Sequence, residues 1–193
     1  MSNNLLVTTA LEQTWDIKKQ IIFLGKWCKK FNNFEKLNSN NYKISTYHWD
    51  NRQKLIEDYQ YSKELYKNLV KQLTNDLNKY HKTNFSERYW KILIGPWLKS
   101  FVQIVLERYS NLKNLFKNYE VKETILLDIG YVKMIPENFE KYSRLMITDT
   151  WNHYIYNSIL NFEKFDFKIN KKYKIFKNDE KFENYLKQNS IPL

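Results

Sequence analysis

The residues best suited to chemistry are concentrated in positions 47–52, which read Tyr-His-Trp-Asp-Asn-Arg. The imidazole of His48 titrates near neutrality, so it is a candidate general base for an attacking hydroxyl group, and Asp50 is a candidate catalytic carboxylate that orients it. Arg52 has the charge and shape to bind a carboxylate or a phosphate. The structural alternative is that Asp50 caps a helix while His48 packs at its entry. The sequence leaves both interpretations open.

A second histidine lies in a similar setting, where positions 151–154 read Trp-Asn-His-Tyr. This pattern is typical of a helix start in which polar side chains lie between aromatic anchors. His153 is therefore a second candidate catalytic residue, and Asn152 is a candidate for binding substrate. The alternative for His153 is a hydrogen-bonded histidine with a structural role.

Three tryptophans and one arginine are further candidates for binding substrate. Trp27 follows an apolar run closed by Gly25, where its ring can stack on a sugar or a base, and packing against a helical layer is the alternative. Arg88 lies in the first turn of an expected helix, where a cation opposes the helix dipole. It therefore either faces a cleft and binds an anion or pairs with a nearby Glu. The other two candidates are Trp15 and Trp97.

Standard nucleotide and metal motifs are absent from the sequence. Only three glycines are present, so a glycine-rich phosphate loop is not available, and phosphate would be bound by helix N-termini or by Lys and Arg. Cys28 is the only cysteine, which excludes an internal disulfide and a Cys-rich zinc site. We expect an inert thiol, no metal and no resident cofactor.

The order of the predicted elements indicates an α/β fold. Short β-prone segments at 5–10, 21–24 and 42–47 are followed by two long helical patterns, from Asp50 to about His81 and from about Ser86 to Phe116. We expect a mainly parallel sheet with long flanking helices.

Later elements of the predicted fold are shorter. Within the second helix, Gly95-Pro96 predicts a kink or a break. Residues 124–128 predict a further buried strand, and a helix begins near Thr148. Residues 1–162 thus form one predicted domain, while residues 163–193 lack a clear period and are expected to be an irregular tail or a truncated linker.

The formal net charge of +11 is compatible with an anionic partner. However, lysines are mixed with acidic residues along the whole chain, so binding to nucleic acid is not favoured. No apolar run approaches the length of a membrane span, and the first residues lack the features of a signal peptide. We therefore expect a cytoplasmic protein.

Six stretches combine rare tryptophan, histidine and Gly-Pro signatures: Leu6–Trp15, Phe23–Cys28, Tyr47–Arg52, Arg88–Trp90, Ile94–Leu98 and Trp151–Tyr154. In order and spacing they resemble the N-terminal region of a family of transferases encoded in surface-polysaccharide loci of spirochaetes and other bacteria. Members of that family are longer chains, similar to two-domain glycosyltransferases.

The resemblance implies a Rossmann-like N-terminal half that receives a carbohydrate acceptor, with a nucleotide-sugar donor as co-substrate. A C-terminal domain, which this chain lacks, would hold the donor, so the chain alone is expected to be nearly inactive. The predicted function is sugar transfer in cell-surface glycan synthesis, with His48 or His153 as base and Arg52 or Arg88 stabilising an anion.

Two alternatives remain open: a non-catalytic basic module that binds nucleic acid or a partner protein, and a remnant without a function of its own. The enzyme hypothesis requires that His48, Trp27, Arg88 and His153 meet in one crevice at the edge of the sheet.

Overall fold

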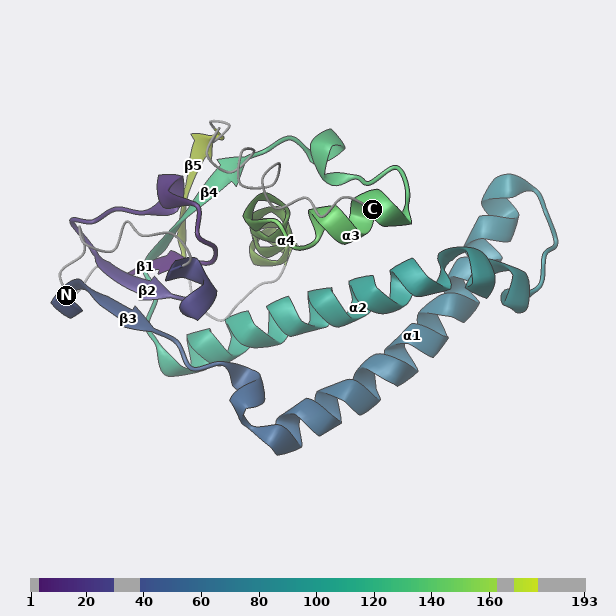
Figure 1. The fold of residues 1–193 in the computed structure, drawn as a ribbon, viewed down its shortest axis with the longest axis horizontal. Coiled ribbons are helices and arrows are strands. Elements are labelled where there is room, and N and C mark those ends of the chain that lie inside the picture. Colours follow the sequence, from purple (N-terminus) through teal and green to yellow (C-terminus); the bar gives the residue numbers. More distant parts are fainter. Residues whose placement is uncertain (1–3, 30–38, 163–168, 177–193) are drawn as a thin grey trace, which may run out of the picture.

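The computed structural model, which describes residues 4–29, 39–162 and 169–176, contains a five-stranded sheet at one side of the molecule (Figure 1). All its strand pairs are parallel, and the strand order is β3-β2-β1-β4-β5. The strands are β1 (Asn4–Val7), β2 (Gln20–Phe23), β3 (Tyr42–Ile44), β4 (Glu123–Asp128) and β5 (Asn170–Ile175). The predicted α/β fold with a mainly parallel, Rossmann-like sheet is confirmed.

The direction of the connections reverses at β1. The chain steps outward from β1 through β2 to β3 and then returns to the other side of β1 as β4. Because the strands are parallel, all their carboxyl ends lie at one edge of the sheet. In open α/β sheets ligands bind at this edge, at the point where the strand order reverses. Here that point lies between β1 and β4.

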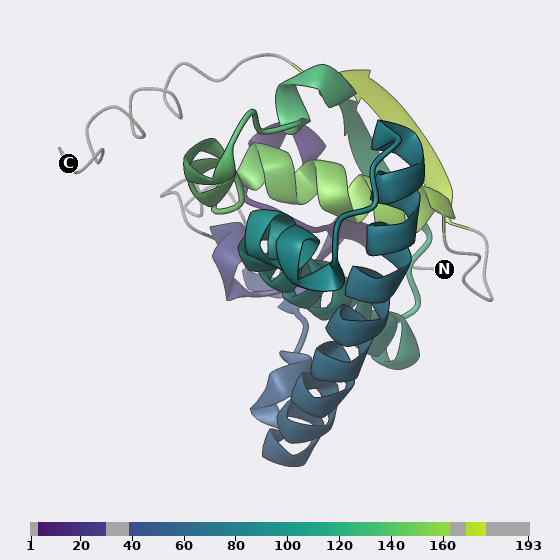
Figure 2. The same cartoon turned by 90° about the vertical axis from the view of Figure 1, so that its right-hand side faces the viewer.

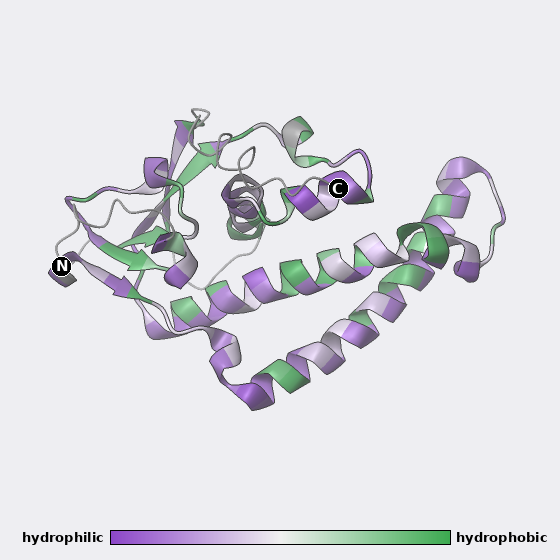
Figure 3. Cartoon of the chain, in the orientation of Figure 1, coloured by the Kyte–Doolittle hydropathy of each residue, from purple (hydrophilic) through white to green (hydrophobic). Residues whose placement is uncertain are grey.

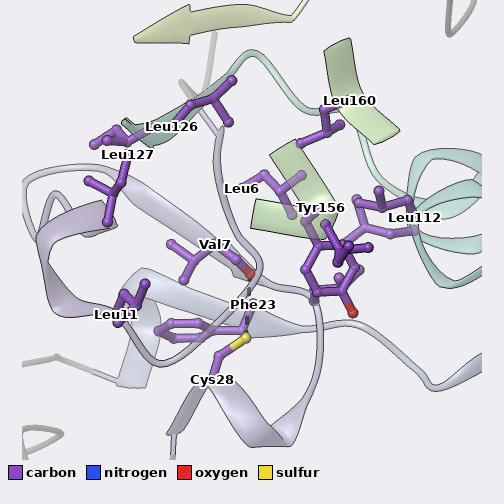
Figure 4. Close-up of a cluster of buried hydrophobic side chains, with 14 of the residues drawn as sticks. Leu6, Val7, Leu11, Phe23, Cys28, Leu112, Leu126, Leu127, Tyr156 and Leu160 are labelled. Carbon is purple, nitrogen blue, oxygen red and sulfur yellow. Dashed lines mark hydrogen bonds between the residues drawn. The ribbon is translucent and has the colours of Figure 1, made fainter. Parts of the chain in front are cut away.

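The three central strands are buried on both faces, as their continuous apolar runs indicate. In β1, Leu5, Leu6 and Val7 are fully buried, and Figure 3 shows apolar residues along the central strands. Residues from β1, β2, β4 and the helices α2, α3 and α4 join one hydrophobic cluster, part of which Figure 4 shows. Cys28 belongs to this cluster, and burial raises the pKa of its thiol to about 12, so the thiol stays protonated.

Strand β5 corrects the prediction of an irregular segment after residue 162. Residues 170–175 read Asn-Lys-Lys-Tyr-Lys-Ile and pair with the full length of β4. Lysine-rich composition is a common protection of an exposed edge strand, and it removes the apolar run by which a strand is recognised. The rest of the predicted tail, residues 163–168 and 177–193, lies outside the described residues.

The helices are α1 (Arg52–His81), α2 (Glu87–Asn118), α3 (Phe139–Leu145) and α4 (Asp149–Phe162). Helices α1 and α2 form a long hairpin that projects away from the sheet (Figures 1 and 2). The C-terminal part of α2 and helix α4 pack on the sheet through Leu112, Leu115 and Leu160. None of the helices within the described ranges combines the length and the apolar character that a membrane crossing requires.

The structure refines two predictions about the long helices: the N-cap of α1 and the course of α2 at Pro96. The N-cap of α1 is Asn51, whose side chain accepts a hydrogen bond from the Lys54 amide at 3.1 Å, and not Asp50, which lies in a preceding 3₁₀ turn. Helix α2 continues through Pro96 without a break. The carbonyl that Pro96 leaves without its helical donor is that of Ile92, an exposed residue that water can reach.

Close packing of the two helices holds this part of α2 in place. Gly95 is buried, and a Cβ atom at its position would lie 2.8 Å from the Tyr66 hydroxyl of α1. The first turns of α2 lie at an angle to the rest of the helix (Figures 1 and 2).

A buried carboxylate joins three parts of the sheet at its amino edge. Glu123, only 3% exposed, forms ion pairs with Lys19 and, at 3.1 Å, with Lys172 of β5. Burial by itself would raise the pKa of Glu123, but the hydrogen bonds and charges of the two lysines outweigh it and hold the pKa below its usual range. The ionised carboxylate therefore stabilises the fold above its unfolded pKa, and this contribution is lost as the pH falls through the folded pKa.

We predict that Glu123→Gln lowers the free energy of unfolding by about 2 kcal/mol at neutral pH, because two lysines lose a charged partner. The difference from the unmodified chain should begin to shrink as the pH falls below about 4.3, the ordinary glutamate pKa, and should disappear below the lower folded pKa. Urea unfolding at several pH values measures both effects. Glu64→Gln, which removes an exposed pair with Lys67, is the control. An equal loss at neutral and acidic pH would contradict the proposed role.

Candidate functional site

A cavity of about 910 Å³ opens at the carboxyl ends of β1, β2 and β3, and we call it the carboxyl-edge pocket. One wall comes from residues that follow these strands, and the opposite wall comes from α2 and α4. The lining residues used below are Thr9, Gly25, Lys26, Trp27, Tyr47, Asp50, Glu107, Arg108, Asp149, Asn152 and Tyr156.

The strand-side wall carries an aromatic surface in a fixed orientation. The Trp27 ring lies directly over Gly25, where a Cβ atom would collide with it, so only glycine allows this position. The indole N–H of Trp27 donates to the Thr8 carbonyl at 3.0 Å. Tyr47 meets the same ring edge-on, with centroids 6.0 Å apart. These contacts hold the indole ring at the edge of the pocket.

The helix-side wall is held together by a hydrogen-bond network. The amide group of Asn152 donates to the carbonyls of Met146 and Thr148 at 3.0 and 2.8 Å, which orients its oxygen toward α2. That oxygen accepts two hydrogen bonds from Arg108, from Nε at 3.0 Å and from Nη2 at 2.8 Å. Arg108 also pairs with Glu107. The network ties the beginning of α4 to the middle of α2.

Asp149 connects the same end of α4 to the sheet. Its carboxylate accepts a hydrogen bond from the Ala10 amide at 3.0 Å, just after β1.

Across the pocket, burial and the nearby Glu107 carboxylate raise the pKa of Tyr47 well above its usual range. The Tyr47 hydroxyl therefore keeps its proton and is a hydrogen-bond donor.

Two buried hydroxyl groups on lining residues have no hydrogen-bond partner within the part of the chain that the structure describes. The side-chain oxygens of Thr9 and Tyr156 make no hydrogen bond to the described residues, although both residues are almost fully buried. Buried polar groups in native proteins are nearly always hydrogen-bonded, and exceptions gather at functional sites. Both hydroxyl oxygens are themselves closed off from solvent, and the Tyr156 hydroxyl lies beside Asn111, so neither is placed to meet a ligand that enters the pocket. Within the described residues, no group of three His, Cys, Asp or Glu side chains could hold a metal ion.

Three of the predicted site residues line the carboxyl-edge pocket: Trp27, Asp50 and Asn152. The two histidines are buried and are not among the lining residues. Four further candidates lie elsewhere. Trp15 packs edge-on against Phe23, Trp97 stacks on Phe101 at 5.2 Å, and Arg52 and Arg88 are exposed near the two ends of the helical hairpin.

The expectation that His48, Trp27, Arg88 and His153 share one crevice is therefore corrected, because only Trp27 lines this pocket. Arg88 lies in the first turn of α2, and α2 reaches the pocket only through residues near its middle. The long helices separate residues that the sequence pattern had grouped together.

His153 is 1% exposed and anchors α4 to the sheet. Its Nε2 accepts a hydrogen bond from the Leu127 amide at 3.0 Å, so this nitrogen carries no proton. Its Nδ1 lies 3.5 Å from the Thr8 hydroxyl. Burial lowers the pKa of His153 to about 3. The side chain is thus a neutral, positioned part of the core below the pocket.

His48 is also buried, at 4% exposed, and burial holds its pKa below the usual value despite the opposing charge of Glu107. Its ring meets Tyr47 with centroids 4.9 Å apart. Neither ring nitrogen makes a hydrogen bond within the described residues, and Asn111 of α2 lies beside the ring outside hydrogen-bonding geometry. The buried His48 ring therefore packs against Tyr47 and helps to hold it in place without lining the pocket itself.

The residues that sequence reasoning missed are mainly those of the helix-side wall: Glu107, Arg108, Asp149 and Tyr156. A signal was present for Arg108. Arg108 lies three residues after Val105 and four residues before Leu112, so it falls on the apolar stripe of α2. A charged residue on a buried stripe needs a partner, and this one has Glu107 and Asn152.

A family model described as LIC12162 family transferase matches residues 4–191. No curated protein and no solved structure matches the chain. The family match spans both walls of the pocket and all of the described strands.

We predict that the folded chain loses stability as the pH falls below about 6.5, because the unfolded His153 binds a proton that the folded one does not. This part of the loss should reach about 2 kcal/mol at pH 5 and should be missing in His153→Gln. Acid and urea unfolding measure it, with exposed His81→Gln as the control. A His153 ring signal that titrates near neutrality in NMR spectra would show that this account of its burial is wrong.

Proposed function

This chain belongs to the LIC12162 transferase family, and we propose that its carboxyl-edge pocket receives the carbohydrate acceptor of a sugar transfer in cell-surface glycan synthesis. The observation that carries the proposal is the combination of a fixed indole ring with the exposed polar side chains of Asp50 and Lys26 at the carboxyl edge of the sheet. An aromatic ring packs against the C–H face of a sugar, and polar side chains around it bind the sugar hydroxyls.

The charges of the pocket favour a neutral acceptor over a nucleotide diphosphate. Asp50, Glu107 and Asp149 line the pocket, against Lys26 and Arg108. Arg108 is already paired with Glu107, so Lys26 is the cation left to face a ligand. A diphosphate would meet more negative than positive charge here. We therefore propose that the nucleotide-sugar donor is bound mainly by a second domain, as in the two-domain glycosyltransferases that the sequence resembles.

Asp50 is the best placed base for the reaction. It is exposed and lines the pocket, whereas both histidines are buried. In the proposed step the acceptor hydroxyl oxygen bonds to the anomeric carbon of the donor as the bond from that carbon to the phosphate oxygen breaks. The hydroxyl proton passes to the Asp50 carboxylate, and the nucleoside diphosphate leaves with the electron pair.

In this proposal each of the remaining predicted site residues either positions another residue or takes no part. His48 supports Tyr47, His153 fixes α4, and Asn152 orients Arg108. Arg52, Arg88, Trp15 and Trp97 take no part in the pocket.

A single buried cysteine is compatible with a reducing compartment, and we place the reaction in the cytoplasm.

We predict that Trp27→Ala weakens sugar binding about tenfold, because the apolar face of the sugar loses its contact. Saturation-transfer NMR with glucose, galactose, N-acetylglucosamine and glucuronic acid measures the effect. Tyr80→Ala, which removes an exposed ring far from the pocket, is the matched control and should leave binding unchanged. Binding that survives Trp27→Ala, or no binding to any of these sugars, would contradict the proposal.

Asp50→Asn should lower kcat by about two to four orders of magnitude with little change in the acceptor KM, because the amide cannot take the proton. The measurement is release of nucleoside diphosphate from nucleotide sugars by enzyme that contains the donor-binding half. Asp76→Asn on the exposed face of α1 is the control. Unchanged turnover in Asp50→Asn would remove Asp50 from the mechanism.

A further inference from the structure

The end of the helical hairpin carries an apolar surface that the proposed function does not use. We call residues 79–93 the hairpin tip; they include the last turn of α1, the connecting turn and the first turns of α2 (Figures 1 and 2). Five large apolar side chains are exposed here: Tyr80 (82%), Phe85 (43%), Tyr89 (40%), Ile92 (68%) and Leu93 (56%). Clustered exposed apolar residues mark an interaction site more often than scattered ones do.

Four of these side chains, those of Phe85, Tyr89, Ile92 and Leu93, lie together. Phe85 stacks on Tyr89 with ring centroids 4.1 Å apart. Tyr89, Ile92 and Leu93 are three and four residues apart on α2, so they share one helix face. Figure 3 shows a hydrophobic turn near the start of α2 beside hydrophilic residues of the same hairpin.

The turn that presents this surface is internally bonded. The Asn78 side chain accepts hydrogen bonds from the Phe85 amide at 2.9 Å, the Thr83 hydroxyl at 3.0 Å and the Trp90 indole at 3.0 Å, and donates to the Phe85 carbonyl at 2.8 Å. The backbone of Phe85 therefore does not depend on water for its hydrogen bonds. A turn of this kind can enter a poorly hydrated environment without leaving these groups unpaired.

Cations surround the apolar surface. Within residues 79–93 there are four Lys or Arg and one Glu, and Lys79, Lys82, Arg88 and Lys91 are all exposed. None of the ion pairs within the described residues involves these four side chains. Arg88 also opposes the dipole of α2, so its position is not explained by helix stability.

We infer that the hairpin tip docks on an anionic membrane surface. Tyrosine and phenylalanine favour the region between lipid headgroups and acyl chains, aliphatic residues enter the acyl boundary, and Lys and Arg bind anionic headgroups. The tip is the protruding end of the hairpin, and a projecting end fits a deformable lipid surface better than a preformed groove in a protein.

The position of the tip leaves the carboxyl-edge pocket open. Asp50 lies just before the 30-residue helix α1, about 45 Å along that helix from the tip, and along α2 the tip ends eleven residues, or about 16 Å, before the first lining residue, Ile104. Membrane docking and substrate binding therefore use different residues of the hairpin, and none of the tip residues lines the pocket. The inference does not rest on the proposed function, and each can fail without the other.

Vesicle sedimentation tests the inference. The full chain should bind vesicles of phosphatidylcholine and phosphatidylglycerol at low salt and should bind vesicles of phosphatidylcholine alone much more weakly. Ile92→Ser/Leu93→Ser should weaken binding to the anionic vesicles about tenfold by removing apolar contact. Arg88→Gln/Lys91→Gln should weaken it about fivefold for each charge removed.

Matched controls separate the tip from the general charge of the chain. Val132→Ser/Ile135→Ser removes two equally exposed apolar side chains elsewhere, and Lys18→Gln/Lys43→Gln removes two exposed cations elsewhere. Both controls should bind anionic vesicles nearly as well as the unmodified chain. Because the substituted side chains are exposed, circular dichroism should show the same fold in all variants.

A reporter at the tip distinguishes insertion from surface attraction. The fluorescence of Phe85→Trp should shift to shorter wavelength on anionic vesicles, relative to the unmodified chain. Three results would overturn the inference: no binding to anionic vesicles, equal binding by tip and control variants, or no shift at position 85. Tip-dependent self-association in sedimentation velocity, without vesicle binding, would assign the surface to a protein contact instead and would also overturn it.

Discussion

The parallel pairing of β1 with β2 on one side and β4 on the other is the constraint on which the molecule depends. It brings the chain segments that follow β1, β2 and β3 to one edge, where Thr9, Trp27 and Tyr47 face the same pocket. It also directs the return from β3 to β4 through the long hairpin, whose second helix supplies the opposite wall. A change in strand order would separate these side chains even if every local element were kept.

Helix α4 supplies part of the wall that makes this sheet edge a pocket. Its beginning is fixed from three directions: Asp149 holds the Ala10 amide, Asn152 holds Arg108, and His153 accepts from the Leu127 amide. Each of these polar groups is satisfied by the protein, so together they specify one position of the helix rather than offering groups to a ligand. The polar side chains left to face a ligand lie at the open side of the pocket, where Asp50 and Lys26 are exposed.

Sequence reasoning identified the fold where the apolar pattern was strong and missed it where the pattern was weak. The buried runs of β1, β2 and β4 and the helical periods of α1 and α2 predicted their elements to within a few residues. Strand β5 was not predicted because its side chains are mostly exposed, so no alternation or apolar run marks it. The pocket was found only in part, because a histidine on a helix can face the core or a cleft, and His153 faces the core. The Arg108–Asn152 pair joins residues far apart in sequence, which no local pattern reveals.

The central claim is that a sugar binds against the Trp27 ring at the carboxyl edge of the sheet. The most direct measurement is an NMR titration of the nitrogen-labelled chain with a monosaccharide, following the six tryptophan indole signals together with the backbone amides. The account predicts that the Trp27 indole signal and the amides of Thr9, Gly25 and Tyr47 shift together with one dissociation constant, while the Trp90 and Trp97 indoles stay unchanged. A Trp27 signal that does not move while other indoles shift would contradict it.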